Sequence, residues 1–194
     1  MSFYFFARSI VTKFLALKGF KVEGLENVPL EGPVIVACNH VSYWDPVLIG
    51  CALPRQVFFM AKDDLFEKPV LGFLIKKLGA FPVKRKQGDV SAIRKSLQIL
   101  KENKVLGIFP EGTRSKSGAI QEALAGVVLI MEKSKAPILP LKVYGARGLL
   151  RQKRGNIGVI IGKPFYASDL EVPDDVENRR LWIANEIMSI IGKM

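Results

Sequence analysis

The single histidine of the chain lies in a segment whose residue types suit acid–base chemistry. This segment, NHVSYWD at 39–45, places an aspartate five residues after His40. On a continuous helix that spacing would leave the two side chains about 140° apart, so they can meet only if the chain turns between them. A carboxylate held against one imidazole nitrogen orients the ring and leaves the other nitrogen as a base near neutral pH. His40 and Asp45 are therefore candidates for a general-base pair, although Asp45 taken alone is more typical of a helix cap before Pro46.

Short apolar runs alternate with amphipathic segments along the chain, and these elements must position the histidine. Runs bounded by glycine, proline or charge predict buried strands over 33–38, 56–60, 79–83, 105–109, 138–144 and 156–161. Helical periodicity predicts helices over 68–78, 90–101 with an Asp89 cap, 121–133 and 174–191. The alternation predicts an α/β fold with a largely parallel mixed sheet flanked by helices. His40 then follows the first of these strands, at the carboxyl end where ligand sites collect in open α/β sheets.

The first 18 residues have the pattern of an amphipathic helix. A projection at 100° per residue places Arg8, Thr12 and Lys13 on one side and gathers apolar side chains on the other: Phe3, Phe6, Ala7, Ile10, Val11, Phe14 and Leu17. Such a helix suits an anionic membrane interface, but a terminal helix docked on its own domain would show the same pattern. Both interpretations stay open at this point. The predicted division is an interface helix at 1–19 and an α/β domain at 20–194, with no run long and apolar enough to span a bilayer.

Composition describes a folded, basic protein. Hydrophobic residues make up 49% and charged residues 24%, which argues against a disordered or disulfide-rich chain. Lysine and arginine total 29 against 18 acidic residues, a net charge of +11, and eight basic residues without an acid lie between 133 and 168. Such charge suits nucleic acid, anionic lipid or a phosphorylated molecule, and does not choose among them.

The chain offers little for metal or redox chemistry. It has one histidine and two cysteines, Cys38 and Cys51, which fit no common ligand spacing and no disulfide framework. We expect no metal and no cofactor, and neither cysteine is marked as an activated nucleophile.

Four motifs in order resemble the glycerolipid acyltransferase family. They are NH followed by four residues and Asp at 39–45, GAFPVKR at 79–85, FPEGTR at 109–114 and the proline-rich APILPL at 136–141. The resemblance covers roughly residues 20–165. It associates Asn39 with the first motif and Pro137 with the fourth.

The resemblance implies a reaction and a set of roles. An acyl group would pass from a thioester, on coenzyme A or acyl carrier protein, to the free hydroxyl of 1-acylglycerol 3-phosphate, giving phosphatidic acid. His40 would take the hydroxyl proton, with Asp45 fixing its tautomer. Arginine forks would hold the acceptor phosphate, and the Glu111 carboxylate would order Arg114. The implied substrate-binding residues are Lys62, Arg85, Glu111, Gly112, Thr113 and Arg114.

The implied partners are lysophosphatidic acid, acyl-CoA or acyl carrier protein and an anionic membrane, with no nucleic acid. The implied location is the cytoplasmic face of the cell membrane, as a peripheral or monotopic protein. Within the same class, an acyltransferase for another lysophospholipid or for glycerol 3-phosphate fits as well. From other classes, a basic nucleic-acid-binding protein lacks a recognised motif here, and a non-catalytic lipid-binding protein leaves the pairing of His40 with Asp45 unexplained.

Overall fold

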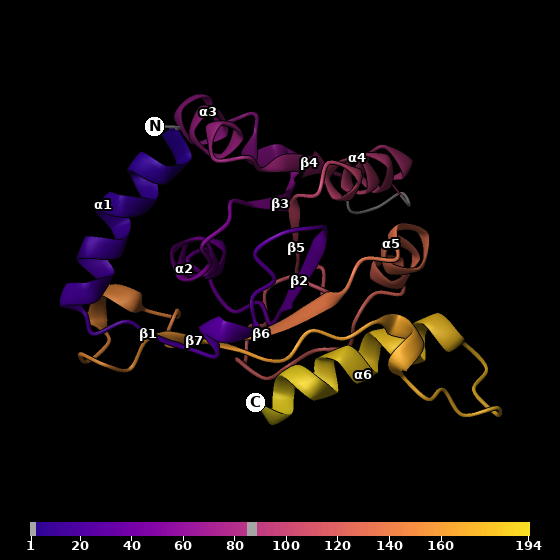
Figure 1. Ribbon diagram of the computed structural model, residues 1–194. Coiled ribbons are helices and arrows are strands. Elements are labelled where there is room, and N and C mark those ends of the chain that lie inside the picture. The colour runs from indigo at the N-terminus through magenta and orange to yellow at the C-terminus, as the bar shows by residue number, and fades with distance from the viewer. Residues whose placement is uncertain (1–2, 85–88) are drawn as a thin grey trace.

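One seven-stranded sheet organises the computed structural model, which describes residues 3–84 and 89–194 (Figure 1). The spatial order of its strands is β1-β7-β6-β2-β5-β3-β4. Neighbouring strands are parallel except for β6 and β7, which confirms the predicted largely parallel mixed sheet. The strands are β1 Lys21–Glu23, β2 Val34–Cys38, β3 Val57–Lys62, β4 Phe81–Val83, β5 Val105–Ile108, β6 Ile138–Tyr144 and β7 Gly158–Ile161.

Helices cover both faces of this sheet (Figure 1). They are α1 Phe3–Leu17, α2 Asp45–Ala52, α3 Pro69–Lys77, α4 Val90–Lys101, α5 Gly126–Ser134 and α6 Arg179–Lys193. Side chains of β2 alternate between two cores: Val34, Val36 and Cys38 pack on the side of α1 and α2, and Ile35 and Ala37 on the side of α4, α5 and α6. His40 lies two residues after Cys38, so its side chain continues this alternation and faces α2.

Three elements differ from the sequence prediction. β1 was not predicted, because it has three residues with charged ends and forms only by pairing with β7. α5 starts at Gly126 rather than at residue 121, because the backbone amides of 121, 123 and 124 donate instead to Glu111, Asn185 and Pro110. α6 starts at Arg179, because the Asn178 side chain accepts from the backbone N–H of Leu181 and caps the helix there.

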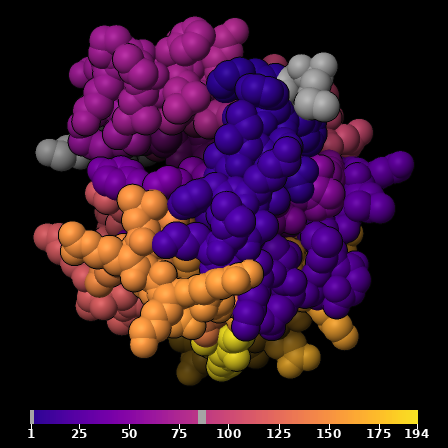
Figure 2. Space-filling model, turned by 90° about the vertical axis from the view of Figure 1, so that its left-hand side faces the viewer, coloured from indigo at the N-terminus to yellow at the C-terminus, as the bar shows by residue number. Residues whose placement is uncertain are grey.

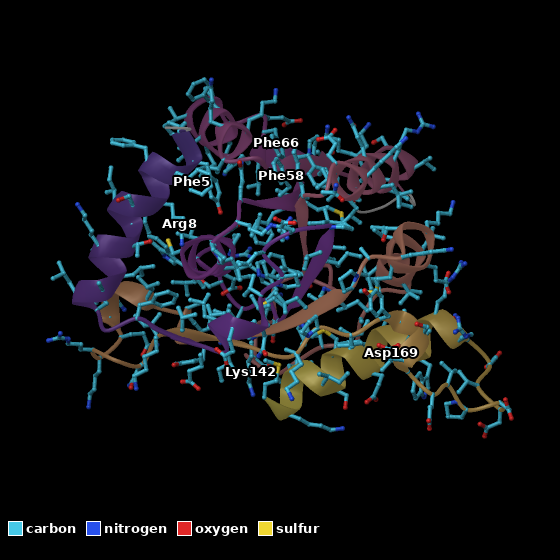
Figure 3. The ribbon with its side chains drawn as sticks, viewed as in Figure 1. Phe5, Arg8, Phe58, Phe66, Lys142 and Asp169 are labelled. Atoms are coloured by element: carbon cyan, nitrogen blue, oxygen red, sulfur yellow. The ribbon has the colours of Figure 1, made fainter. Side chains whose placement is uncertain are left out.

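The first helix packs on the domain through one face. Tyr4 and Leu15 are buried, and the Tyr4 hydroxyl donates to the carbonyl of Gly50 at 3.4 Å. Arg8 points from α1 toward α2 and donates to the carbonyl of Cys51 at 3.3 Å (Figure 3). Both carbonyls belong to the last turn of α2, whose final carbonyls have no partner within their own helix. α1 therefore supplies the C-terminal cap of α2 from outside.

The orientation of α1 corrects one detail of the sequence prediction. The projection placed Arg8 and Thr12 on the polar side of an interface helix, whereas the Arg8 Nε and the Thr12 hydroxyl are buried. The opposite face leaves large apolar side chains exposed: Phe3, Phe6, Ile10, Phe14 and Leu17. The helix is thus docked on its inner side and apolar on its outer side. None of the helices in residues 3–84 and 89–194 is long and apolar enough to cross a membrane.

Candidate active site

His40 and Asp45 form a direct pair at the carboxyl end of β2. The Nδ1 atom of His40 lies 2.7 Å from Oδ2 of Asp45, whose side chain is fully buried. Because a carboxylate oxygen can only accept, the hydrogen bond places a proton on Nδ1 and leaves Nε2 as the basic nitrogen. The side chain of His40 retains 12% of its exposure, so the ring is accessible from one side. The predicted pairing is confirmed in geometry.

The turn between the two residues is held by the same carboxylate. Oδ2 of Asp45 also accepts the backbone N–H groups of Val41 and Ser42, each at 2.7 Å. Asp45 is the first residue of α2 and Pro46 the second, a position where a missing N–H costs no hydrogen bond. The carboxylate therefore folds the 41–44 loop back on the helix start, which gives a spacing of five residues a contact that a continuous helix could not make.

An aromatic stack supports the histidine ring. Phe109 lies parallel to His40 with ring centroids 3.9 Å apart, and Phe59 lies against Phe109 at 5.6 Å. Phe109 follows β5, and Phe59 lies on β3, the strand next to β5. The stack restricts tilting of the imidazole, so that Asp45 and Phe109 together fix the direction of Nε2.

The backbone of His40 is held by the segment that follows β5. Oε1 of Glu111 accepts the N–H of His40 at 2.7 Å, and the N–H of Ser115 donates to its carbonyl at 2.7 Å. Oε2 of Glu111 accepts hydrogen bonds from the backbone N–H and from the side-chain amide of Gln121, and the carboxylate is buried. The expectation that Glu111 orders Arg114 is wrong, because both carboxylate oxygens are engaged by His40 and Gln121; its part in substrate binding stays a prediction. Glu111 instead joins the first motif to the 121 loop.

The last three residues of the FPEGTR segment reach the surface. Gly112 has φ 66°, a left-handed conformation that glycine adopts without strain. Thr113 is exposed. Arg114 is also exposed, and its guanidinium lies 3.6 Å above the ring of Tyr43 while Nη2 donates to the Tyr43 hydroxyl at 3.0 Å. Tyr43 therefore holds the guanidinium of Arg114 beside the loop that follows His40.

Two further cationic positions were predicted for the acceptor phosphate. Lys62 ends β3, at the same edge of the sheet as His40, because β3, β5 and β2 are parallel neighbours. Its ammonium is half-exposed and pairs with Asp64. Arg85 lies outside the described residues, so its role stays a prediction.

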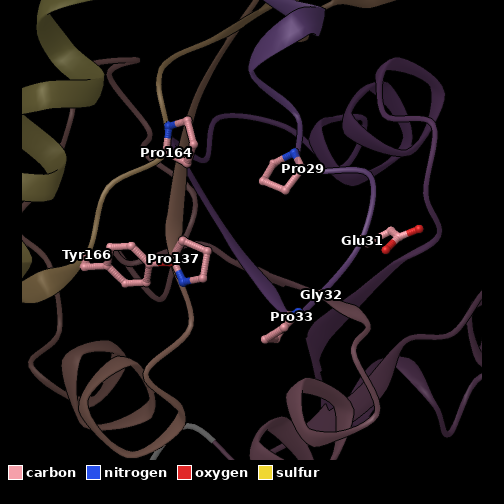
Figure 4. Close-up of a pocket in the computed structure, with 7 residues that line it drawn as sticks. All are labelled: Pro29, Glu31, Gly32, Pro33, Pro137, Pro164 and Tyr166. Atoms are coloured by element: carbon pink, nitrogen blue, oxygen red, sulfur yellow. The ribbon is translucent and has the colours of Figure 1, made fainter.

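Asn39 and Pro137 occupy different ends of the sheet. Asn39 is buried, and its side-chain amide bridges to β6 by accepting from the N–H of Val143 at 2.8 Å and donating to its carbonyl at 3.0 Å. It thereby extends the β2–β6 pairing by one residue, up to His40. Pro137 precedes β6 beside Ile35, so it lies at the amino end of β2 and is not brought to the site. There it helps to line a surface pocket with Pro29, Glu31, Gly32, Pro33, Pro164 and Tyr166 (Figure 4).

The two cysteines are buried thiols. Burial, reinforced by the nearby Asp45 charge, raises the pKa of Cys38 well above its ordinary value, and burial raises the pKa of Cys51 as well. A thiolate at Cys38 is thus disfavoured next to the pair. Within residues 3–84 and 89–194, no three side chains of the types His, Cys, Asp or Glu gather to hold a metal ion.

Sequence reasoning gave no role to Tyr43, Ser115 or Phe109. All three lie inside or beside the motifs quoted above, and their positions in the motifs were the available signal. Their contacts depend on β2 and β5 being neighbours in the sheet, which the sequence does not state.

Comparison with known proteins shows what this chain is similar to. A model of the family described as acyltransferase matches residues 19–144. The 1-acyl-sn-glycerol-3-phosphate acyltransferase of Bacillus subtilis (strain 168) is 35% identical over 169 residues, covering 86% of this chain and 84% of that protein. The enzyme of the same name from Streptococcus pneumoniae is 32% identical over 146 residues, covering 73% of this chain and 53% of that protein.

A solved structure shares the fold. The crystal structure of the 1-acyl-sn-glycerophosphate (LPA) acyltransferase PlsC from Thermotoga maritima superposes with a TM-score of 0.67 at 24% sequence identity. The match covers 100% of this chain and 84% of that chain. The arrangement of sheet and helices described above is therefore that of a solved acyltransferase.

Proposed function

Because the chain belongs to the acyltransferase family, we propose that it transfers a fatty acyl group from an acyl thioester to the free hydroxyl of 1-acylglycerol 3-phosphate, giving phosphatidic acid. The names of the relatives from Bacillus subtilis and Streptococcus pneumoniae support this choice of acceptor. The observation that carries the mechanism is the 2.7 Å contact between His40 and a buried Asp45, which leaves one basic nitrogen at the sheet edge.

The chemical step needs one base and no acyl-enzyme. Nε2 of His40 takes the proton from the acceptor hydroxyl as its oxygen forms a bond to the thioester carbonyl carbon. The tetrahedral intermediate collapses by breaking the carbon–sulfur bond, and the imidazolium returns the proton to the departing thiolate. Asp45 stabilises the imidazolium between these two transfers. Base assistance of this kind contributes about 10² to 10⁴ in rate.

Direct attack by the acceptor is preferred over a cysteine intermediate. Cys38 is the thiol nearest to His40 in sequence, but burial raises its pKa well above the ordinary value. Its sulfur also donates a hydrogen bond to the Asn39 side chain at 3.4 Å, inside the core. A buried, protonated thiol is a poor nucleophile.

The acceptor phosphate is assigned to the cations at the same edge of the sheet. Arg114 presents its guanidinium on Tyr43, and Lys62 extends from the end of β3. A guanidinium fork matches two phosphate oxygens, and an ammonium adds a point charge. Arg85 completes the set in the proposal on the strength of the motif alone.

The remaining features of the proposal concern the donor and the location. The donor is acyl-CoA or acyl carrier protein, used as a co-substrate without a cofactor or a metal. The protein acts at the cytoplasmic face of the membrane as a peripheral or monotopic enzyme. Support comes from the exposed apolar side of α1 and from the net charge of +11, which favours anionic lipid and a phosphorylated or acidic carrier.

The test is release of free thiol from acyl-CoA that depends on added lysophosphatidic acid. Wild-type protein should turn over with this acceptor faster than with glycerol 3-phosphate or lysophosphatidylcholine. His40→Ala should lose at least two orders of magnitude in kcat, and Asp45→Asn should lose less because the base survives in a poorer orientation. Thiol release without an acceptor, or near-normal turnover by His40→Ala, would overturn the proposal.

A further inference from the structure

The short helix α3 exposes nearly all of its apolar side chains. Within Pro69–Lys77 only Gly72 is buried, while four large apolar residues face outward: Val70, Leu71, Phe73 and Leu74. Val70 and Phe73 retain 83% and 64% of their accessible surface. A surface helix of a globular domain normally turns such residues toward the core. The exposed side of α3 therefore requires a separate explanation.

The way α3 packs fixes this outward direction. A Cβ added at Gly72 would lie 2.4 Å from the carbonyl oxygen of Phe66, so the helix contacts the preceding turn through its glycine. The N–H of Gly72 donates to the carbonyl of Lys68 at 2.6 Å, which begins the helix at that contact. Because α3 meets the Phe66 turn at a position where even a Cβ does not fit, a rotation that turned Val70 or Phe73 toward that turn would place a side chain against its backbone.

The exposed side of α3 adjoins the exposed side of α1. In Figure 1 the start of α1 lies beside α3, and Figure 2 shows both helices on the same face of the molecule. Arg8 points inward from α1 toward α2 in Figure 3, so the outer residues Phe3 and Phe6 point away from the domain on this face. Exposed apolar side chains of both helices therefore lie on neighbouring parts of the molecule.

Charge indicates what covers this surface. The cationic charge beside α3 lies mainly at its carboxyl end, where Lys76 and Lys77 are exposed in the last turn; at its amino end the exposed Lys68 follows the exposed Glu67. Lys13 lies on the exposed part of α1. Apolar side chains rimmed by ammonium groups match an anionic lipid leaflet, where the lysines reach headgroups and the apolar residues enter the acyl boundary.

We propose that α3 is a second membrane-inserting element, which acts with the outer side of α1 to fix the orientation of the domain on an anionic bilayer. One helix lying in the interface leaves the domain free to rock about the helix axis, whereas a second contact away from that axis removes this freedom. The proposal rests on the proposed function only in taking the acceptor to be a membrane lipid.

The position of α3 in the chain connects this orientation with the site. β3 ends at Lys62, and the short turn Asp63–Leu65 leads from that end toward α3. The first turn of α3 is therefore joined to the sheet edge at which His40 lies. Insertion of Val70 holds that edge near the bilayer, where an acceptor can reach Nε2 without leaving the lipid phase.

A matched pair of substitutions tests the proposal. Val70→Asp places a charge on α3, and Val90→Asp places the same charge on α4, where Val90 is the first residue of the helix and 65% exposed. Both proteins should unfold at the wild-type temperature, because both sites are exposed. Cosedimentation with vesicles of phosphatidylcholine and phosphatidylglycerol should show partitioning lowered at least tenfold by Val70→Asp and less than twofold by Val90→Asp.

Three outcomes decide the question. Wild-type partitioning by Val70→Asp overturns the proposal, as does a wild-type dimer in solution that Val70→Asp converts to a monomer, because a second copy then covers α3. The selective loss described above supports it. Turnover with a short-chain, water-soluble acceptor is measured in parallel and should be unchanged in Val70→Asp. If wild-type protein has no such turnover, the proposed function fails while the vesicle result still decides the role of α3.

Discussion

Leu15 and Leu17 provide a test of how α1 is used, because they are the same residue type two positions apart on opposite sides. Leu15 is fully buried in the core shared with α2, and Leu17 is 77% exposed. Leu15→Ala should therefore weaken the fold, and Leu17→Ala should weaken only the contact with membrane. The expected magnitudes differ enough to be separated by a single set of measurements.

The magnitudes follow from burial. Truncating a buried leucine to alanine costs about 2 to 5 kcal/mol, because the lost transfer free energy is joined by a cavity. In a chain of this size each kcal/mol lowers Tm by about 2 to 4 °C, so Leu15→Ala should lower Tm by roughly 4 to 20 °C. An exposed truncation such as Leu17→Ala changes stability by less than about 0.5 kcal/mol, yet it removes up to about 2 kcal/mol of apolar insertion.

Thermal and urea unfolding without detergent measure the stability of each variant. Cosedimentation of the folded protein with vesicles measures its binding to membrane. Leu15→Ala should lose stability and, below its Tm, bind vesicles like the wild type. Leu17→Ala should keep its Tm and bind vesicles up to about thirtyfold more weakly. Equal small changes in Tm for the two variants would refute the docked position of α1. Deletion of residues 1–18 should then destabilise the domain as well, because it removes Leu15 together with the Arg8 cap of α2.

Three further predictions concern the guanidinium of Arg114, the thiol of Cys38 and the Asp89 cap of α4. Arg114→Ala should raise KM for lysophosphatidic acid at least tenfold and leave KM for the donor nearly unchanged; Tyr43→Ala should reproduce part of this rise and Tyr43→Phe little of it, whereas equal effects on both substrates in steady-state kinetics would contradict the assignment. Cys38 should resist a thiol reagent at pH 7.5 in the folded protein and react once unfolded, as followed by mass spectrometry, because burial raises its pKa; rapid labelling of the folded protein would disprove its burial. A hydrogen bond from Ser91 lowers the pKa of Asp89 to about 2, so the cap of α4 contributes fully above about pH 4 and is lost as pH falls through about 2; Asp89→Ala should cost about 1 kcal/mol in urea unfolding at pH 6 and progressively less toward pH 2, and a constant difference would count against this linkage.

The sequence predicted the contact of His40 with Asp45 because the turn that makes it is local. The pair is five residues apart, and Pro46 marks a helix start, so the contact needed only one reversal of direction. The expected contact of Glu111 with Arg114 was wrong for the opposite reason. Its hydrogen bond to the backbone of His40 spans 71 residues and exists because β2 and β5 are paired, a fact that no local pattern contains.

The sequence pattern identified the outer side of α1 correctly but not the side that docks on the domain. The apolar projection identified the outer residues Phe6 and Leu17, but the docking side is formed by Tyr4, Arg8 and Leu15, which mix aromatic, charged and aliphatic types. Such a side is recognisable only from the surface it meets, here the last turn of α2. For the same reason the start of α5 could not be read from periodicity, since distant acceptors take the amide hydrogens of residues 121, 123 and 124.

The edge strand β1 has a consequence for the order in which the protein can fold during synthesis. Lys21 pairs with Gly158, so β1 emerges from the ribosome long before its partner strand exists. At about 5 to 20 residues per second, the 136 residues between Lys21 and Gly158 take roughly 7 to 27 s to make, and closing a loop of that length costs about 4 kcal/mol of chain entropy. Leu15 shares its core with Ile157 and Val159, which arrive equally late. The first helix of the chain is therefore among the last to be completely packed, and throughout that interval its outer apolar side is available to a nearby bilayer.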